Sequence, residues 1–337
     1  MPIDTVQEAL HIRRKKNAQV FRNIARLWEI GQKSHNDQEL LDALHPWRED
    51  HGLRFFNVLP YLLGIMSLGT LIFGYFLHPH LQFIWSFLAA SLLGFLAYLM
   101  YEPAEPISQV TRFLEERITQ LRYGLKFQQL PAYIPIQAQP ILVLSKLKQY
   151  FPLFNRGTLS NDITQYAATT WHDGATEHQV LIFQYHYVSE MTVLQDSRTN
   201  QKMTKEIHKD LWGALIFQMP NLGIAVSNQQ SRFFAPYHNT WHSSDILINQ
   251  KLHIAGLDQH QLAKTISPSM TLKLNDFFQH FNGDLIYHHQ EQILCYLGEQ
   301  NLFQTASKRT QIDDISALRG HLRTMIMPQY QRLQQLM

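Results

Sequence analysis

The chain has 337 residues, of which 45% are hydrophobic and 17% are charged, and its 29 Lys and Arg residues nearly balance 27 Asp and Glu residues. A formal net charge of +2 leaves no basic field of the kind that holds nucleic acid, so nucleic-acid binding is not expected. Cys295 is the only cysteine, which excludes an internal disulfide and is typical of a reducing compartment.

The first 54 residues predict a helical arm. Apolar side chains recur at a loose helical period over residues 6–30, which indicates an amphipathic helix. This helix carries the basic run at residues 13–16, which either touches anionic lipid headgroups or forms a solvated helix face. Asn36, with Glu39 three positions later, is the pattern of an N-cap and its capping-box partner, so a short helix is expected from there to His45.

An uncharged block follows, because residues 55–101 contain no Asp, Glu, Lys or Arg. The block divides at His78-Pro79-His80 into residues 55–77 and 81–101, and a helix needs about 20 residues to cross a hydrocarbon core of about 30 Å. The alternative is a buried pair of core helices, which ordinarily carries a polar stripe and occasional charges. The block therefore predicts an antiparallel transmembrane hairpin.

Cations predict the orientation of this hairpin. Nine Lys or Arg residues precede it and four more follow within 25 residues of its end, at Arg112, Arg117, Arg122 and Lys126, whereas the connecting turn has none. Cytoplasmic segments beside membrane helices carry such an excess. Both termini are expected in the cytoplasm, with residues 78–80 outside.

Residues 102–158 are expected to form an amphipathic stalk and a linker. From about Ile107, apolar residues recur at spacings of three and four, at Ile107, Val110, Leu114, Ile118, Leu121 and Leu125. Such a stripe needs a partner, which is either the arm at residues 6–30 or a second copy of the chain. Four prolines then surround one short apolar helix at residues 141–150.

Residues 159–337 predict a cytoplasmic mixed domain that ends in a helix. Strands are expected over residues 163–171, 178–188, 207–219, 222–227, 284–289 and 292–297. One helix is expected to begin at Ser267-Pro268, and a long one over residues 312–336 is expected to be interrupted by Pro328. Strands followed by helices, without regular βαβ alternation, favour an α+β class. Residues 195–205 and 229–243 are expected loops to which the sequence assigns no role.

Several short motifs occur together in the C-terminal half. Asp258 and Gln259 precede Ala263, and Ser267-Pro268 opens a helix before Gly283 and a strand pair that ends at Phe303; upstream, residues 210–220 form a strand around Gly213. In this order, and behind a membrane hairpin, they resemble a bacterial family of two-helix membrane proteins classed as a domain of unknown function.

The resemblance implies a bacterial inner-membrane protein. It also implies a LemA-type membrane protein as a possible partner, since relatives are often encoded beside such proteins. It supplies no catalytic residue. In its light Gly213 serves close packing or a bulge, Ser267 caps a helix, and Gly283 stops one.

The tightest histidine group is His238-Asn239-Thr240-Trp241-His242, with Asp245 three residues on. Two histidines at i and i+4 on a helix would share a face and could hold a transition metal, but Pro236 and the polar neighbours predict a loop. The glutamate of a zinc-protease motif is absent. The group is therefore either the centre of a metal-dependent hydrolase or a polar surface loop.

Other catalytic patterns are missing from the sequence. There is no nucleophile elbow, phosphate loop or dinucleotide fingerprint, and Cys295 lies in an apolar strand where thiols are usually inert. His172-Asp173 is either an acid–base pair or, with Gly174, a turn. No catalytic residue and no cofactor are predicted. The expected function is a non-enzymatic interaction or scaffolding module at the membrane; the alternatives are the His238/His242 hydrolase and a lipid sensor that uses residues 13–16.

Overall fold

The computed structural model describes residues 15–47, 50–77, 81–131, 140–173, 176–195, 202–220, 222–229, 236–288, 290–308 and 311–337. The chain divides into two compact units. The first, which we call the helical unit, comprises Met1–Leu121 and Ser307–Met325, and the second, the sheet unit, comprises Arg122–Ala306 and Ile326–Met337. Unlike in the expected division at residue 158, residues 122–158 belong to the sheet unit, and residues 307–325 belong to the helical unit.

The helical unit contains the arm, the apolar hairpin and the stalk. Its helices are α2 (Lys15–Lys33), α3 (Asp37–Ala43), α4 (Val58–Leu77), α5 (Leu81–Met100), α6 (Glu105–Tyr123) and α11 (Ile315–Thr324). Asn36 caps α3 as predicted, since its side chain accepts a hydrogen bond of 2.7 Å from the Glu39 N–H. The basic run at residues 13–16 lies partly outside the described residues, as does the turn at residues 78–80.

The apolar stripe of α6 packs against the arm. One buried cluster contains Val20, Ile24 and Leu27 of α2, Val110, Leu114 and Ile118 of α6, and Ile315, Leu318 and Leu322 of α11. The closest approach is at Gly31, where an added Cβ would overlap the Phe113 ring, which stacks on Trp28 at 4.2 Å between centroids. Of the two partners expected for the stripe, the arm of the same chain is the one observed.

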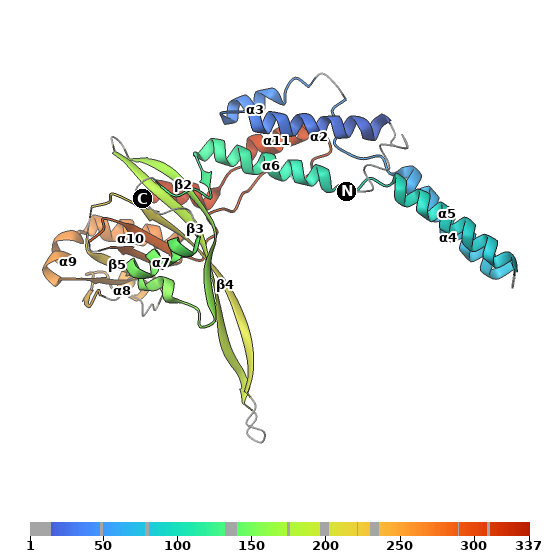
Figure 1. Ribbon diagram of the computed structural model, residues 1–337. Helices are drawn as coiled ribbons and strands as arrows, with labels where there is room; N and C mark the ends of the chain where they lie inside the picture. Colours follow the sequence, from blue (N-terminus) through green and yellow to red (C-terminus); the bar gives the residue numbers. More distant parts are fainter. Residues whose placement is uncertain are drawn as a thin grey trace. The chain divides into compact units, whose positions relative to one another are not determined.

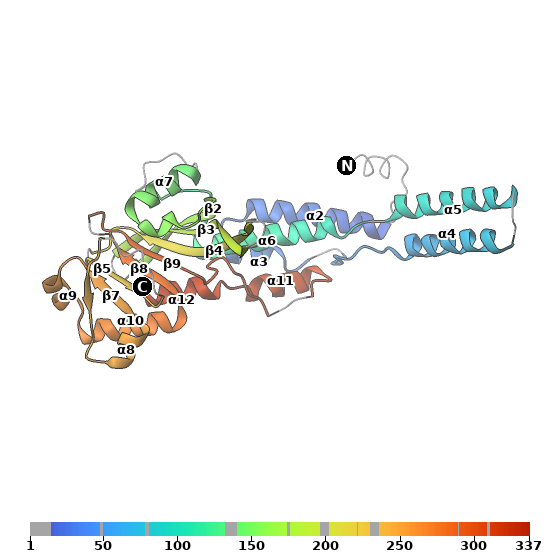
Figure 2. The ribbon, with the colours of Figure 1, turned by 90° about the horizontal axis from the view of Figure 1, so that it is seen from below.

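Helices α4 and α5 lie side by side in both views (Figures 1 and 2). Each has 20 residues, is apolar enough to cross a membrane, and has only 11% of its most apolar window buried. Large apolar side chains therefore face outward along the whole hairpin, among them Ile65, Leu68, Phe76, Trp85 and Phe95. The alternative of a buried core pair is wrong.

The sheet unit is built on one antiparallel sheet. In the described part of the chain its strands are β1 (Lys126–Phe127), β2 (Ser160–Asp173), β3 (Thr176–Gln195), β4 (Lys202–Ile216), β5 (Ile224–Ser227), β6 (Asn239–Trp241), β7 (His253–Gly256), β8 (Gly283–Tyr287) and β9 (Leu294–Gly298). Their order in space is β1-β2-β3-β4-β9-β8-β5-β7-β6. Figure 1 shows the long β3–β4 pair extending well beyond its neighbours.

Helices flank both faces of this sheet (Figure 2). The helices of the unit are α7 (Pro140–Tyr150), the 3₁₀ turn η1 (Pro152–Asn155), α8 (Ile246–Lys251), α9 (Gln259–Thr265), α10 (Pro268–His280) and α12 (Pro328–Leu336). One core cluster joins the sheet to α10 and α12, and a second joins the opposite face to α7 and η1. The predicted α+β character is confirmed.

Two predictions about the C-terminal region are confirmed. Ser267 caps α10 by accepting a hydrogen bond from the Met270 N–H at 3.2 Å. Gly213 serves close packing, because an added Cβ would lie 2.6 Å from the Tyr296 carbonyl oxygen and 2.5 Å from the Phe183 ring.

Three other expectations are wrong in detail. Gly283 does not stop a helix but opens β8 at a φ of +153°, against the backbone of β9. The expected connection at residues 195–205 is shorter, because β4 already begins at Lys202. The helix over residues 312–336 is interrupted at Pro328 as expected, but the break is longer: α11 ends at Thr324, and Ile326 pairs with Ala306 before α12 begins.

Candidate functional site at the open end of the hairpin

A single side chain closes the open end of the apolar hairpin. Asn57 directly precedes α4, and Glu102 follows α5 by two residues. The Asn57 side-chain amide donates to the Glu102 carbonyl oxygen at 2.7 Å, and its oxygen accepts from the Glu102 N–H at 3.2 Å. The Asn57 amide thus pairs with both the N–H and the carbonyl of Glu102, just after the end of α5.

Two buried asparagines of α2 hold the segment that leads into the hairpin. Asn17 accepts a hydrogen bond of 2.8 Å from the Phe56 N–H, and Asn23 donates to the carbonyl oxygens of Asp50 and Gly52 at 2.8 and 3.1 Å. Both side chains are almost fully buried, at 3% and 1% exposure. Because a buried amide is costly to leave without partners, these contacts define the path of the chain at this point.

A C-terminal segment of the helical unit, residues 313–315, lies beside the chain that leads into the hairpin. Leu53 donates its N–H to the Asp313 carbonyl oxygen at 3.0 Å, and Ile315 donates to the His51 carbonyl oxygen at 3.0 Å. α11 is in turn attached to the stalk, because His321 Nε2 lies 2.7 Å from Glu115 Oε1. These hydrogen bonds hold the segment before α4 next to the segment before α11.

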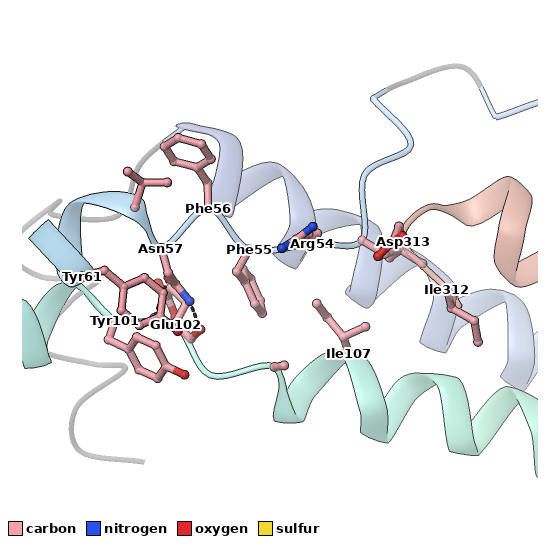
Figure 3. A pocket seen from close by; sticks show the side chains of 13 residues that line it. Arg54, Phe55, Phe56, Asn57, Tyr61, Tyr101, Glu102, Ile107, Ile312 and Asp313 are labelled. Atoms are coloured by element: carbon pink, nitrogen blue, oxygen red, sulfur yellow. Dashed lines mark hydrogen bonds between the residues drawn. The ribbon is translucent and has the colours of Figure 1, made fainter. Parts of the chain in front are cut away.

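These three segments line a cavity of about 670 Å³ that is partly open to solvent (Figure 3). Its apolar walls include Phe55 and Ile107, which point toward one another across it, and Tyr61 and Tyr101, whose rings meet edge to face at 6.1 Å. Sites for small ligands commonly have volumes of about 300–1,000 Å³ and mostly apolar walls. We call this space the hairpin-base cavity.

The hairpin-base cavity also has charged groups in its lining: Arg54, Glu102 and Asp313. Arg54 and Asp313 are exposed, whereas Glu102 is 3% exposed. A second cation lies at the edge of the same region, since the Lys16 ammonium is 5.5 Å from the centre of the Phe56 ring. An apolar space with one guanidinium and two carboxylates suits a ligand that is itself amphipathic and carries both signs of charge.

The two histidines of the alternative metal-site hypothesis flank a short strand. β6 runs between His238 and His242, and both side chains are exposed. Residues four apart on an extended strand lie on the same face, with about 13 Å between their Cα atoms. Asp245 instead caps α8 by accepting from the Leu247 N–H at 2.8 Å. Among the described residues no group of three His, Cys, Asp or Glu side chains is arranged to hold a metal.

The other titratable candidates have structural roles. Trp171 is buried and donates to the Tyr330 hydroxyl at 2.8 Å, while His172 faces Glu177 across the β2–β3 pair at 3.1 Å. Burial, and secondarily Asp284, raise the pKa of the Cys295 thiol well above its usual value, so this cysteine is a poor nucleophile. His172 is thus part of an exposed cross-strand pair.

His186 and His208 form a further polar pair that the sequence reading did not single out. Their rings stack at 5.5 Å between centroids, and His186 Nδ1 lies 2.8 Å from Asp210 Oδ1. All three side chains lie on the β3–β4 pair, where cross-strand neighbours of this kind stabilise the pairing. These side chains therefore form a cross-strand contact on the surface of the sheet.

No protein-family model, curated protein or solved structure matches this chain. The family resemblance of the C-terminal motifs therefore stays a prediction. The residues of the hairpin-base cavity were not singled out in the sequence, although one signal was present. Arg54 and Glu102 are the first charged residues on either side of the uncharged block, so they mark where the hairpin ends.

Proposed function

We propose that this chain is a two-pass protein of the bacterial inner membrane with both termini in the cytoplasm. The observation that carries the proposal is the outward-facing apolar surface of α4 and α5, on which Ile65, Leu68 and Phe76 are 68%, 62% and 78% exposed. A water-soluble fold rarely exposes an apolar surface of this extent, whereas a bilayer covers it. The excess of Lys and Arg beside both helix ends supports the orientation.

We further propose that the protein acts as a non-enzymatic interaction or scaffolding module at the cytoplasmic face. In the sheet unit, the candidate interaction surface is the part of the β3–β4 pair that extends beyond β2 and β9. β2 accompanies β3 only as far as Val188, and β9 accompanies β4 only from Trp212 onward. Within the described residues, 189–195 and 202–207 pair only with each other. We call this two-stranded extension the ribbon.

The ribbon supports the proposal because both of its edges carry backbone groups without a neighbouring strand. An isolated two-stranded ribbon is marginally stable, and a partner that adds a strand to its edge satisfies those groups. Charged residues such as Glu190 and Lys205 keep such an edge from indiscriminate pairing. The family resemblance suggests a LemA-type membrane protein as this partner; self-association through the ribbon is the alternative.

Membrane insertion is tested by extraction and reporter fusion. We expect the full chain to stay in the pellet after alkaline carbonate treatment, since only detergent replaces the bilayer around α4 and α5. A reporter at residue 79 should be active outside the cytoplasm, and one at the C-terminus only inside. Release by carbonate contradicts membrane insertion, and an externally active C-terminal fusion reverses the orientation.

The interaction role is tested by shortening the ribbon. Residues 189–207 are replaced by Asn-Gly, which forms a tight turn between the paired residues Val188 and His208. We expect proteins that copurify from gently solubilised membranes with the full chain to be lost, while the melting temperature changes little. A matched control keeps the ribbon and replaces His238 and His242 by Ala. Equal copurification with the shortened ribbon would contradict this assignment.

A further inference from the structure

We propose that the hairpin-base cavity binds one phospholipid whose headgroup carries both a phosphate and a primary ammonium group, as in phosphatidylethanolamine. The inference rests on the proposed function, because it takes α4 and α5 to cross a bilayer. It adds a ligand site at a defined place in the helical unit. The position of the cavity, its charges and its apolar walls each support it.

The cavity lies where a headgroup would be. Val58 is the first residue of α4 and Tyr101 follows the last residue of α5, and both line the cavity. When the two helices span the hydrocarbon core, their ends reach the headgroup layer, where Tyr is favoured because its ring is apolar and its hydroxyl polar. Tyr61 and Tyr101 occupy this level together.

The charges fit a headgroup that carries both signs. Arg54 is exposed, and no ion pair or hydrogen bond to its guanidinium is found within the described part of the chain. A guanidinium binds phosphate through two parallel hydrogen bonds. Asp313 supplies a carboxylate to an ammonium group, and Glu102 adds a second negative charge to the lining.

The same charges disfavour the other common headgroups. A phosphatidylglycerol headgroup could place its phosphate at Arg54, but it has no ammonium group for the Asp313 carboxylate. A choline headgroup is cationic, but its quaternary nitrogen has no N–H to donate. A primary ammonium provides three donors, which suits the carboxylate side of the cavity.

The apolar walls give the acyl chains a continuous path. Val58 and Tyr61 are 50% and 61% exposed, and the outward-facing side chains of α4 continue from them along the hairpin. A lipid seated with its phosphate at Arg54 would lay its chains on this surface, as any annular lipid does. Only its headgroup would enter the hairpin-base cavity.

The first test measures lipid preference and needs no variant. The full chain is extracted in a mild detergent, stripped of lipid, and mixed with dioleoyl phosphatidylethanolamine, phosphatidylglycerol or phosphatidylcholine. We expect native mass spectrometry to show one bound phosphatidylethanolamine, and this lipid to raise the melting temperature most. Equal retention of all three lipids, or a preference for phosphatidylglycerol, would overturn the proposal.

A second test uses substitutions at the charged lining. Arg54→Gln and Asp313→Asn should each weaken phosphatidylethanolamine binding about tenfold, the effect of losing one charge-assisted hydrogen bond. Arg54→Lys should weaken it less, because the positive charge remains. The control is Arg112→Gln on α6, which removes the same charge from a side chain that is 79% exposed and pairs with Glu116. An equal loss in the control would overturn the proposal.

Two further arms separate the possible sources of failure. Inorganic phosphate and free ethanolamine are added to the stripped protein, and stabilisation equal to that of the lipid would assign the cavity to a soluble ligand and overturn the proposal. Carbonate extraction is run on the same preparation. A chain that resists extraction but retains no lipid refutes the cavity assignment alone, whereas a chain that is released refutes the membrane proposal on which it rests.

Discussion

The hairpin and the sheet unit differ in where their large apolar side chains lie: these face outward in the hairpin and inward in the sheet unit. In the sheet unit, Phe, Tyr and Leu side chains fill two clusters between the sheet and its flanking helices. In the hairpin such side chains point outward, and small residues meet between the helices: an added Cβ at Gly74 would overlap Ser86, and Ser67 donates to the Ala90 carbonyl oxygen at 2.6 Å. Close approach of small residues is typical of helix pairs in a bilayer, where lipid provides no hydrophobic force between helices.

If α4 and α5 cross a bilayer as proposed, the two regions are built for different solvents. Water drives the burial of apolar surface in the sheet unit, and the same force acts on the stalk, where Leu114 and Ile118 are fully buried. The hairpin instead depends on backbone hydrogen bonds within its helices and on polar contacts at its open end. The effect of a substitution should therefore depend on whether burial of apolar surface or hydrogen bonding stabilises the region.

The largest effect is expected from Leu114→Asp in the stalk. Leu114 is 0% exposed in the cluster that joins α2, α6 and α11. Its burial contributes roughly 2 kcal/mol, and a buried carboxylate without a partner adds several kcal/mol more. We expect the helical unit to lose its cooperative unfolding transition, as measured by calorimetry of the full chain in detergent. Leu121→Asp in addition should abolish any residual transition.

Ser108→Asp is the matched control for this substitution. It places the same carboxylate on the exposed face of α6, near the helix N-terminus, where a negative charge is favourable. Its melting temperature should equal that of the parent chain. A stalk that tolerates Leu114→Asp would show that the buried stripe does not hold the helical unit together.

The next largest effect is expected at a buried ion pair of the sheet unit. Arg156 Nη2 lies 2.6 Å from Asp284 Oδ2, and the Asp284 side chain is 0% exposed. Arg156→Met leaves that carboxylate buried without its cation and should destabilise the unit by about 3–5 kcal/mol. The double substitution Arg156→Met with Asp284→Leu should recover most of this loss, because no charge remains buried. Urea unfolding of both variants measures the difference, and additive losses would contradict the pairing.

A smaller effect is expected at Asn57, which joins the start of α4 to the segment after α5. Asn57→Ala leaves the N–H and carbonyl of Glu102 without their partner, at a cost of about 1–3 kcal/mol. Hydrogen exchange at the Glu102 N–H should accelerate, while exchange within α4 and α5 should not. Gln109→Ala, which removes an exposed amide from α6, is the control and should change neither. Unchanged exchange at Glu102 would show that this amide does not close the hairpin.

Local patterns in the sequence predicted most of the elements. Uncharged length revealed α4 and α5, serine followed by proline revealed the start of α10, and alternation revealed the central part of β3. Each of these signals depends on residues within one element, where spacing and chain stiffness decide the conformation. Two short elements were missed: β6, which lies in the expected loop at residues 229–243, and α8, because three and six residues are too few to show a period.

Long-range pairing could not be predicted. Leu53 bonds to Asp313, and the chain enters the helical unit again at Ser307, although no local pattern distinguishes this segment from its neighbours. Nothing in the sequence around Asn57 reveals that Glu102 lies opposite. The hairpin-base cavity was therefore invisible in the sequence, because its walls come from three segments that only the fold brings together.

The smallest effect is expected from replacing His238 and His242 together by Ala. Both side chains are exposed at the two ends of β6, so neither contributes burial, and substitutions at such positions change stability by less than about 0.5 kcal/mol. The variant should match the parent chain in melting temperature and in membrane content. Zn²⁺ at micromolar concentration should shift the melting temperature of neither protein, since among the described residues no third ligand is arranged beside these two histidines. A stabilisation by Zn²⁺ that the double substitution abolishes would instead favour the metal-dependent hydrolase over the interaction module.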